Sequence, residues 1–382
     1  MKNGTCDRWR PIHFYAAAAG AAAFFLAGTG TARADYLEVC RDAQARGEVL
    51  DQSCTEALRR EEDRQSFGLS LGTSQYTLGP RAFLARENLG TNVLELGIAR
   101  PGSHVRTNTY GLEYSSDGFS PFGLSSSSSL PFGGEVWRIF GSLMWSEGSA
   151  NTFFPTIDPG AGHGLGIPGI NGGASGIFLP VNPQNTVVDA EHRVEIRWGQ
   201  VDLNLGFATD DNLYTPDFHV GLRYSDLDQR ERFGGDIPGY GAGSGFQYQF
   251  HAETRAVGIH AGFSGAVPLR SNDSWDVALR YAGEFGVARI SGDGFAQLEN
   301  YGTLAVVPPS SNTFDISGYG AYASLQASLE ARFNERFSAQ LGVRYDLRPW
   351  GAGFSGDGTN PFTMQFQDMQ VVTAFLGARV RF

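Results

Sequence analysis

Beyond Gly28 the chain has no apolar run of the ~18 residues that a membrane-spanning helix needs. Lysine is nearly absent, and the 382 residues include only 3 cysteines and 7 histidines. Long amphipathic helices, which could cover one face of a soluble sheet, are also missing. These absences exclude a helical membrane protein, and they leave any β-sheet without a covering layer of helices.

Few residues suggest catalysis or cofactor binding. The formal net charge of −11 argues against binding to nucleic acid. The histidines occur in no HExxH or Cys-His spacing that predicts a metal site. A serine–histidine pair formed by Ser264 with His219 or His260 is the alternative, but a polar side chain inside a barrel is the usual interpretation of such positions. We therefore predict no enzymatic activity, no cofactor and no metal.

The amino-terminal residues predict export. Basic residues precede an apolar run at 15–28, which is too short to cross a bilayer. Ala32-Arg33-Ala34 then forms a small-x-small cleavage signature, so residues 1–34 are predicted to be a signal peptide. An uncleaved anchor helix is the alternative.

Residues 35–64 form a second predicted segment, which is charged and shows no strand pattern. We expect a short helical segment in the periplasm. Cys40 and Cys54 lie within it, and in an oxidising compartment they are expected to form a disulfide. Two free thiols are the alternative.

Residues 65–382 alternate between apolar and polar positions, most clearly at the carboxyl end. There Val372, Leu376 and Val380 share a face, while Arg379 and Arg381 lie on the other, because a strand has a period of two. The same pattern recurs at 336–348, 318–333, 275–287, 255–269 and 218–224. This repetition predicts an all-β fold, a single antiparallel transmembrane β-barrel with its apolar side toward lipid. The terminal Phe382 is predicted to be a signal for the barrel-assembly machinery.

Further candidate strands determine the expected strand number. They lie at 66–76, 93–100, 105–114 and 135–145, with a weak candidate at 81–86. Including the weak one gives about twelve strands, an even number as in bacterial single-chain barrels, while ten or fourteen stay open. Long outer loops are expected at 148–187, 230–248, 292–313 and 349–368, and 117–133 would be an unusually long periplasmic turn.

The alternation changes parity within 188–209. Ile196 and Trp198 are even-numbered apolar residues, whereas Val201 and Leu203 are odd-numbered. A two-residue hairpin or a one-residue bulge at Gly199 would produce this change. A regular succession of long and short connections favours one strand with a bulge.

Polar positions opposite the apolar face define a predicted lumen. A barrel of about twelve strands is wider than an eight-stranded barrel, whose interior is filled by side chains, and narrower than the 16–18-stranded porins. We therefore expect a modest channel whose ion preference depends on the lumen charges. These lumen residues are Arg223, Arg280, Glu284, Glu330, Arg332, Arg344, Asp346, Arg348, Arg379 and Arg381.

Several segments of the carboxyl-terminal half carry a family resemblance. They are 201–206 (VDLNLG), 218–229 (FHVGLRYSDLDQ), 258–269 (GIHAGFSGAVPL) and the closing strands at 340–346 and 373–382. Over about 190–382 the chain resembles the Legionella-type pore-forming major outer-membrane protein family. The resemblance implies pore formation and carries over no catalytic residues.

The sequence thus predicts a porin-like, weakly selective diffusion channel for ions and small solutes. Its expected place is the outer membrane of a Gram-negative bacterium, in contact with lipid and lipopolysaccharide, and homo-oligomerisation stays open. The alternative is a non-conducting barrel with a structural, adhesion or surface-interaction role through its long outer loops. An autotransporter-type translocator is a weaker third reading.

Overall fold

A computed structural model describes residues 43, 46, 65–79, 83–88, 93–96, 104–117, 136–171, 177–179, 186–208, 217–271, 275–306, 309–333, 336–355 and 362–381. The predicted signal peptide, the Cys40–Cys54 disulfide and Phe382 lie outside these residues and stay predictions. Among the described residues, no helix is long and apolar enough to cross a bilayer.

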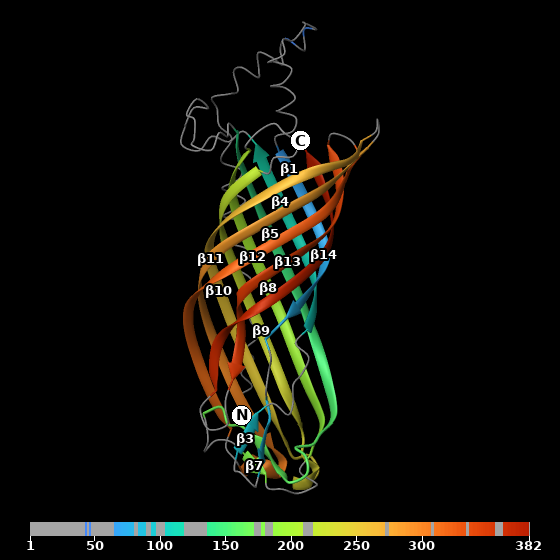
Figure 1. Ribbon diagram of the computed structural model, residues 1–382. Helices are drawn as coiled ribbons and strands as arrows, with labels where there is room; N and C mark the ends of the chain where they lie inside the picture. Colours follow the sequence, from blue (N-terminus) through green and yellow to red (C-terminus); the bar gives the residue numbers. More distant parts are fainter. Residues whose placement is uncertain are drawn as a thin grey trace.

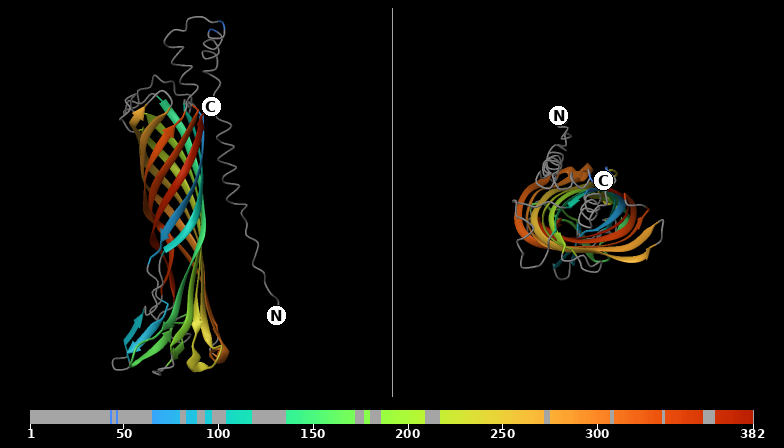
Figure 2. Two further views of the ribbon diagram at one scale, coloured as in Figure 1. Left: turned by 90° about the vertical axis from the view of Figure 1, so that its right-hand side faces the viewer. Right: turned by 90° about the horizontal axis from the view of Figure 1, so that it is seen from above.

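Ten antiparallel strands close into a barrel in the order β1-β14-β13-β12-β11-β10-β9-β8-β5-β4, and β4 pairs with β1. The barrel is a long cylinder with the carboxyl terminus at one end (Figure 1), and its outline is a ring when seen along the axis (Figure 2). The strands are β1 (Gln65–Thr77), β4 (His104–Asp117), β5 (Val136–Ile157), β8 (Val187–Ala208), β9 (Asp217–Asp236), β10 (Gly245–Ser271), β11 (Asp276–Tyr301), β12 (Ser310–Arg332), β13 (Phe337–Ser355) and β14 (Thr363–Arg381).

The expected strand number of about twelve is therefore corrected to ten. The candidates at 81–86 and 93–100 do not join the barrel, because β2 (Ala85–Asn88) and β3 (Val93–Leu96) belong to a separate sheet. That sheet has the order β3-β2-β6-β7, with β6 (His163–Ile167) and β7 (Ile177–Leu179), and lies at the end opposite the carboxyl terminus (Figure 1). Strands of 4 residues are too short for a wall that needs roughly 9–11. We call the end opposite the carboxyl terminus the outer end. It also contains two 3-10 helices, η3 (Pro238–Tyr240) and η4 (Gly302–Val306).

The outward face of the barrel carries a belt of exposed apolar side chains. Because exposing so much apolar surface to water is unfavourable, the belt has the character of a lipid-facing barrel wall. Its members include Leu69, Leu71, Tyr110, Leu112, Val220, Leu222, Val257, Ile259, Phe285, Val287, Leu325, Leu329, Leu341, Val343, Val372 and Leu376.

The two faces of the long strands exchange polarity beyond this belt. On β10, Val257 and Ile259 face outward in the belt, whereas the outward residues on the far side of Val257 include Arg255 and Glu253. The inward face changes in the opposite sense, from the polar His260 in the belt to apolar residues such as Phe250. A strand that leaves an apolar surrounding for water needs this exchange, because its outward side chains then contact water and its inward ones form a core.

This exchange explains the parity change in 188–209. β8 is one continuous strand, as predicted, but the predicted bulge at Gly199 is wrong, because the pairing with both neighbours has no register shift there. Even-numbered side chains stay inward from Ala190 to Gly206; over this stretch the inward face changes from Gln200 and Asp202 to the apolar Ile196 and Trp198.

The expected outer loops are corrected for the same reason. The barrel strands continue well into all four, with β9 reaching Asp236 and β11 reaching Tyr301. Outward polar pairs lie between the belt and these extensions, including Arg197 with Glu147 at 2.9 Å and His251 with Asp228 at 3.0 Å. Loss of the outward apolar pattern resembles the end of a strand in sequence, although the strand continues.

Two apolar clusters fill the barrel interior between the level of the belt and the end opposite the carboxyl terminus. The cluster that we call the inner apolar layer receives side chains from all ten barrel strands, with those of β5 only partly buried. Its members are Tyr76, Leu78, Val105, Val194, Ile196, Trp198, Leu227, Ala256, Ala288, Ile290, Tyr322, Trp350, Met369 and Val371, with Met144 and Ala150 packed against them.

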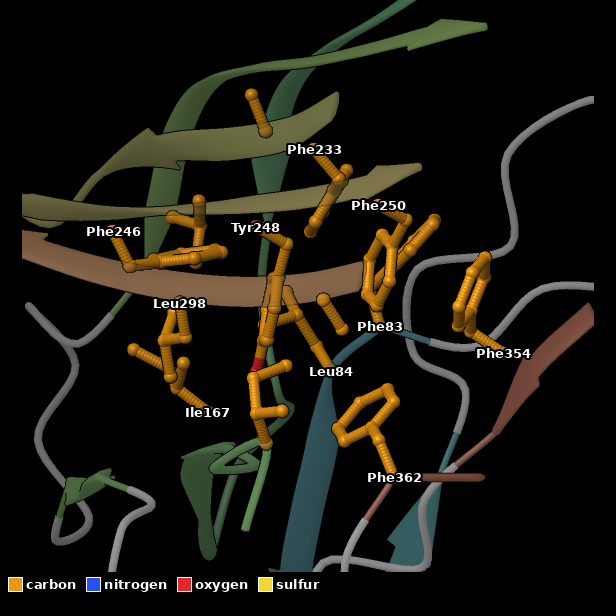
Figure 3. Packing of buried hydrophobic residues seen from close by; sticks show 14 of the residues in the cluster. Phe83, Leu84, Ile167, Phe233, Phe246, Tyr248, Phe250, Leu298, Phe354 and Phe362 are labelled. Atoms are coloured by element: carbon orange, nitrogen blue, oxygen red, sulfur yellow. The ribbon is translucent and has the colours of Figure 1, made fainter. Parts of the chain in front are cut away.

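The second cluster, the outer apolar core, lies beyond this layer and is built partly by segments outside the wall. Phe83, Leu84 and Ile167 pack against inward side chains of β9 and β10 (Figure 3). The rings of Phe83 and Phe233 stack with centroids 4.7 Å apart. The Tyr248 hydroxyl donates to the Pro168 carbonyl at 2.6 Å, which ties the 158–171 segment to β10.

The outer part of β13 also turns into the interior. Its pairing with β12 ends at Leu347, and its register with β14 shifts between Arg348 and Gly351. Beyond this bulge, the inward Thr254 hydroxyl donates to the Trp350 carbonyl at 2.9 Å, and the inward Gln229 amide donates to the Ala352 carbonyl at 3.0 Å. Side chains of β10 and β9 thus hold the end of β13 across the barrel.

Candidate functional site in the barrel interior

The polar layer, defined as the inward polar side chains at the level of the belt, contains the ten predicted lumen residues. Each occupies an inward position of its strand: Arg223, Arg280, Glu284, Glu330, Arg332, Arg344, Asp346, Arg348, Arg379 and Arg381. Five of these residues are joined to one another by ion pairs and come from three strands, β9, β11 and β13. They are Arg223, Glu284, Arg344, Asp346 and Arg348.

The centre of this layer is a buried ion network. Arg223 Nε donates to Asp202 Oδ1 at 2.6 Å, while its Nη2 donates to Glu284 Oε2. Arg344 and Arg348 both approach Asp346, at 3.0 Å each. The side chains of Arg223 and Asp202 are only 2% and 3% exposed. Buried charges require such pairing, because desolvation of an unpaired ion is costly.

Nearer the carboxyl-terminal end, arginines again meet carboxylates. Arg379 lies 2.6 Å from Glu113, and Arg280 donates to Glu330. Arg381 lies 3.9 Å from Glu330. Two of these inward acids, Asp202 and Glu113, were missed by the sequence analysis, although both alternate with apolar neighbours. The ten predicted lumen residues comprise seven arginines and three acids, and these two further acids reduce that basic excess.

Hydroxyl groups complete the wall opposite this network. Ser74 bonds both Thr109 and Thr373 at 2.6 Å, and Ser146 bonds Thr109 at 3.0 Å. A cavity of about 30 Å³ beside Arg344 and these hydroxyls has room for roughly two water molecules. Arg344, Thr109 and Thr373 line this cavity.

The two inward histidines form a cluster with Glu284. His219 Nε2 lies 3.7 Å from Glu284 Oε1, and the rings of His219 and His260 meet edge to face with centroids 5.9 Å apart. His260 Nε2 bonds Asn204 Oδ1 at 2.6 Å, and its Nδ1 lies 3.2 Å from the Tyr322 hydroxyl. The donor atoms of the two histidines and Glu284 all lie within 4.8 Å of one another, so this cluster could hold a metal ion.

The same contacts bear on the serine–histidine alternative. Both ring nitrogens of His219 have no hydrogen-bond partner among the described residues, and those of His260 face Asn204 and Tyr322. No hydrogen bond therefore joins Ser264 to either imidazole in this part of the chain. An activated serine requires that bond, so the geometry does not assemble a catalytic pair.

Comparisons with known proteins identify no relative that assigns a function. No protein-family model matches the chain, and no curated protein matches it. Similar solved structures include the outer membrane protease OmpT from Escherichia coli (10% identity, TM-score 0.33, covering 84% of this chain and 97% of that one). The translocator domain of autotransporter NalP from Neisseria meningitidis has 10% identity and a TM-score of 0.30, covering 91% and 98%. The Pseudomonas putida toluene transporter TodX has 9% identity and a TM-score of 0.24, covering 84% and 91%. At such values these proteins carry no argument about function.

Proposed function

We propose that this chain is a non-conducting outer-membrane β-barrel that presents its extended outer end to the cell surroundings. The barrel closes with an apolar outward belt, and the N-terminal sequence predicts export. A closed barrel leaves no unpaired strand edge in lipid, which is the condition for spanning a bilayer with strands. The belt would contact lipid, and the charged outer wall would lie among lipopolysaccharide head groups.

The observation that carries the non-conducting role is the inner apolar layer. Side chains from all ten strands enter it, and the end of β13 crosses the interior beside it. Ions do not pass a packed apolar layer without losing their hydration, which costs far more than thermal energy. The polar layer then acts as paired filling that holds the wall strands in register.

The porin-like channel expected from the sequence, and from the family resemblance, is the second candidate. The inward arginines favour it, but six of the seven are paired with carboxylates and lie on one side of the apolar layer. The six are Arg223, Arg280, Arg344, Arg348, Arg379 and Arg381. We propose no enzymatic activity, because the geometry offers no serine–histidine pair.

Planar-bilayer recording tests the choice. Purified full-length protein should insert without step conductance, while a known porin in the same lipid conducts. A variant that lacks residues 350–367, with β13 and β14 joined by a short turn, loses Trp350 and the crossing segment and should conduct. Step currents from the unaltered protein would establish the channel and contradict this proposal. Recovery of the protein outside the outer-membrane fraction would contradict its location.

A further inference from the structure

The strand register brings His219, His260 and Glu284 together. His219 on β9 pairs with Gly262 on β10, and Gly262 pairs with Glu284 on β11. The two side chains therefore lie in one row across three strands, with a glycine between them. His260 follows on the same inward face of β10, opposite Gly221. Residues separated by 65 positions in sequence thus share one small region.

Glycines leave the room that this arrangement needs. A Cβ atom at Gly262 would overlap the imidazole of His219, and one at Gly221 would overlap the Asn204 amide and crowd His260 Nε2. The imidazole rings of His219 and His260 therefore lie in the space that side chains at Gly262 and Gly221 would occupy. The cluster is therefore a formed cradle, and a larger residue at either position would displace its donor atoms.

The donor atoms suit a transition-metal ion. Two imidazoles, one carboxylate and the Asn204 carbonyl oxygen offer four ligands, which fits Zn²⁺ and neighbouring divalent ions. His219 is 3% exposed, and neither of its ring nitrogens has a hydrogen-bond partner among the described residues. A buried imidazole without partners is costly, and a metal bond to Nε2 would satisfy one of its nitrogens.

Neighbouring residues orient the donors. Arg223 and Arg344 approach Glu284 Oε2, which leaves Oε1 directed toward His219. The Tyr322 hydroxyl oxygen faces His260 Nδ1 and can accept a hydrogen bond from Nδ1–H when Nε2 binds a metal. The positive charge of Arg223 opposes a cation, but Asp202 offsets it at 2.6 Å. This balance favours an exchangeable site over a permanently filled one.

The cluster lies on one side of the inner apolar layer, which stands between it and the outer end of the barrel. On the other side, β9 begins two residues before His219 at Asp217, and Asp217 and Arg138 are 37% and 40% exposed. That end carries the carboxyl terminus, which is periplasmic under the proposed orientation.

From these observations we propose that His219, His260, Glu284 and Asn204 form an exchangeable binding site for a divalent transition-metal ion, open to the periplasmic end of the barrel. The site goes beyond the non-conducting role and does not depend on it, because its residues lie on the periplasmic side of the apolar layer.

The test uses full-length protein in detergent, stripped with a chelator and titrated with Zn²⁺ by calorimetry and with Co²⁺ by visible absorption. We expect one ion per chain and an absorption band of imidazole-bound Co²⁺. His219→Gln should weaken binding at least about 100-fold, because even residues that only orient a ligand contribute 10–100-fold. The matched control is His251→Gln, since His251 lies on the outer wall, and it should bind like the unaltered protein.

Circular dichroism and heat-dependent gel mobility establish that each variant is folded. If His219→Gln does not fold, Glu284→Gln provides the same test with almost unchanged size. Failure of the unaltered protein to bind one ion, or equal binding by a folded cluster variant, would overturn the proposal. Loss of binding in His251→Gln alone would place the ion on the outer wall and overturn it as well.

Discussion

The guanidinium of Arg348 lies over the indole ring of Trp198, with its Cζ atom 3.8 Å from the ring centroid. Arg348 belongs to the buried ion network through Asp346, and Trp198 belongs to the inner apolar layer. The pair marks the level at which the barrel interior changes from polar to apolar. Its cation–π contact lets a buried charge meet an apolar layer without a gap.

Trp198→Ala should therefore strongly destabilise the barrel. Removing a buried aromatic ring costs about 3–5 kcal/mol, and Arg348 would lose its ring partner. Trp198→Phe keeps a ring but loses the 2.8 Å hydrogen bond from the indole nitrogen to Ser225. Beyond the cost of the smaller ring, it should therefore lose only about 1 kcal/mol of unfolding free energy. Urea unfolding in lipid vesicles measures both. Phe153→Ala, at an exposed position, is the control and should change little.

The Arg223–Asp202 pair should show strong coupling. Arg223→Met leaves the buried Asp202 carboxylate without its arginine and should cost about 3–5 kcal/mol of unfolding free energy. Asp202→Asn leaves Arg223 paired with Glu284 and should cost less. The double variant should cost clearly less than the sum of the two. Arg193→Met, which breaks an exposed pair with Glu195 on the outer wall, should cost at most about 1 kcal/mol. Additive losses at Arg223 and Asp202 would show that the pair is not coupled.

The edge of the apolar belt can be located by adding charge on the outward face of β10. Phe263 lies midway along the belt residues of this strand, so Phe263→Arg should cost about 2–4 kcal/mol in a lipid bilayer. Gln249 has the same outward orientation beyond the belt, and Gln249→Arg should be nearly neutral. Folding equilibria in vesicles compare the two. Equal costs would mean that the belt does not face lipid.

Alkaline pH should loosen the outer apolar core first. Burial raises the pKa of Tyr248 well above its ordinary value, so the folded state keeps the phenol neutral while the unfolded state ionises near pH 10. The stabilisation is full below about pH 10 and decreases as the pH rises above that value. Tyr248→Phe removes the hydrogen bond to the Pro168 carbonyl, so it should lose about 1 kcal/mol of unfolding free energy at neutral pH. The variant should then lose less stability than the unaltered protein when the pH rises above about 10. Proteolysis of the 158–171 segment from pH 8 to 11 measures both effects.

The sequence by itself determined the fold class and the orientation of individual side chains within the belt. Alternation placed Arg344 and Arg379 opposite Leu341 and Val380, and the structure has the same assignment. The reason is local: a strand has a period of two, so neighbouring residues establish the two faces without reference to the rest of the chain.

Only the tertiary structure decided how many strands close the barrel and whether its interior is open. Alternation separates two faces, but it does not say which one meets lipid, water or protein, and that changes along β8 between Gln200 and Trp198. The row of His219, Gly262 and Glu284 likewise depends on the register of three strands. Register and closure arise from pairing between distant segments, because a strand acquires an inside only when the sheet closes on itself.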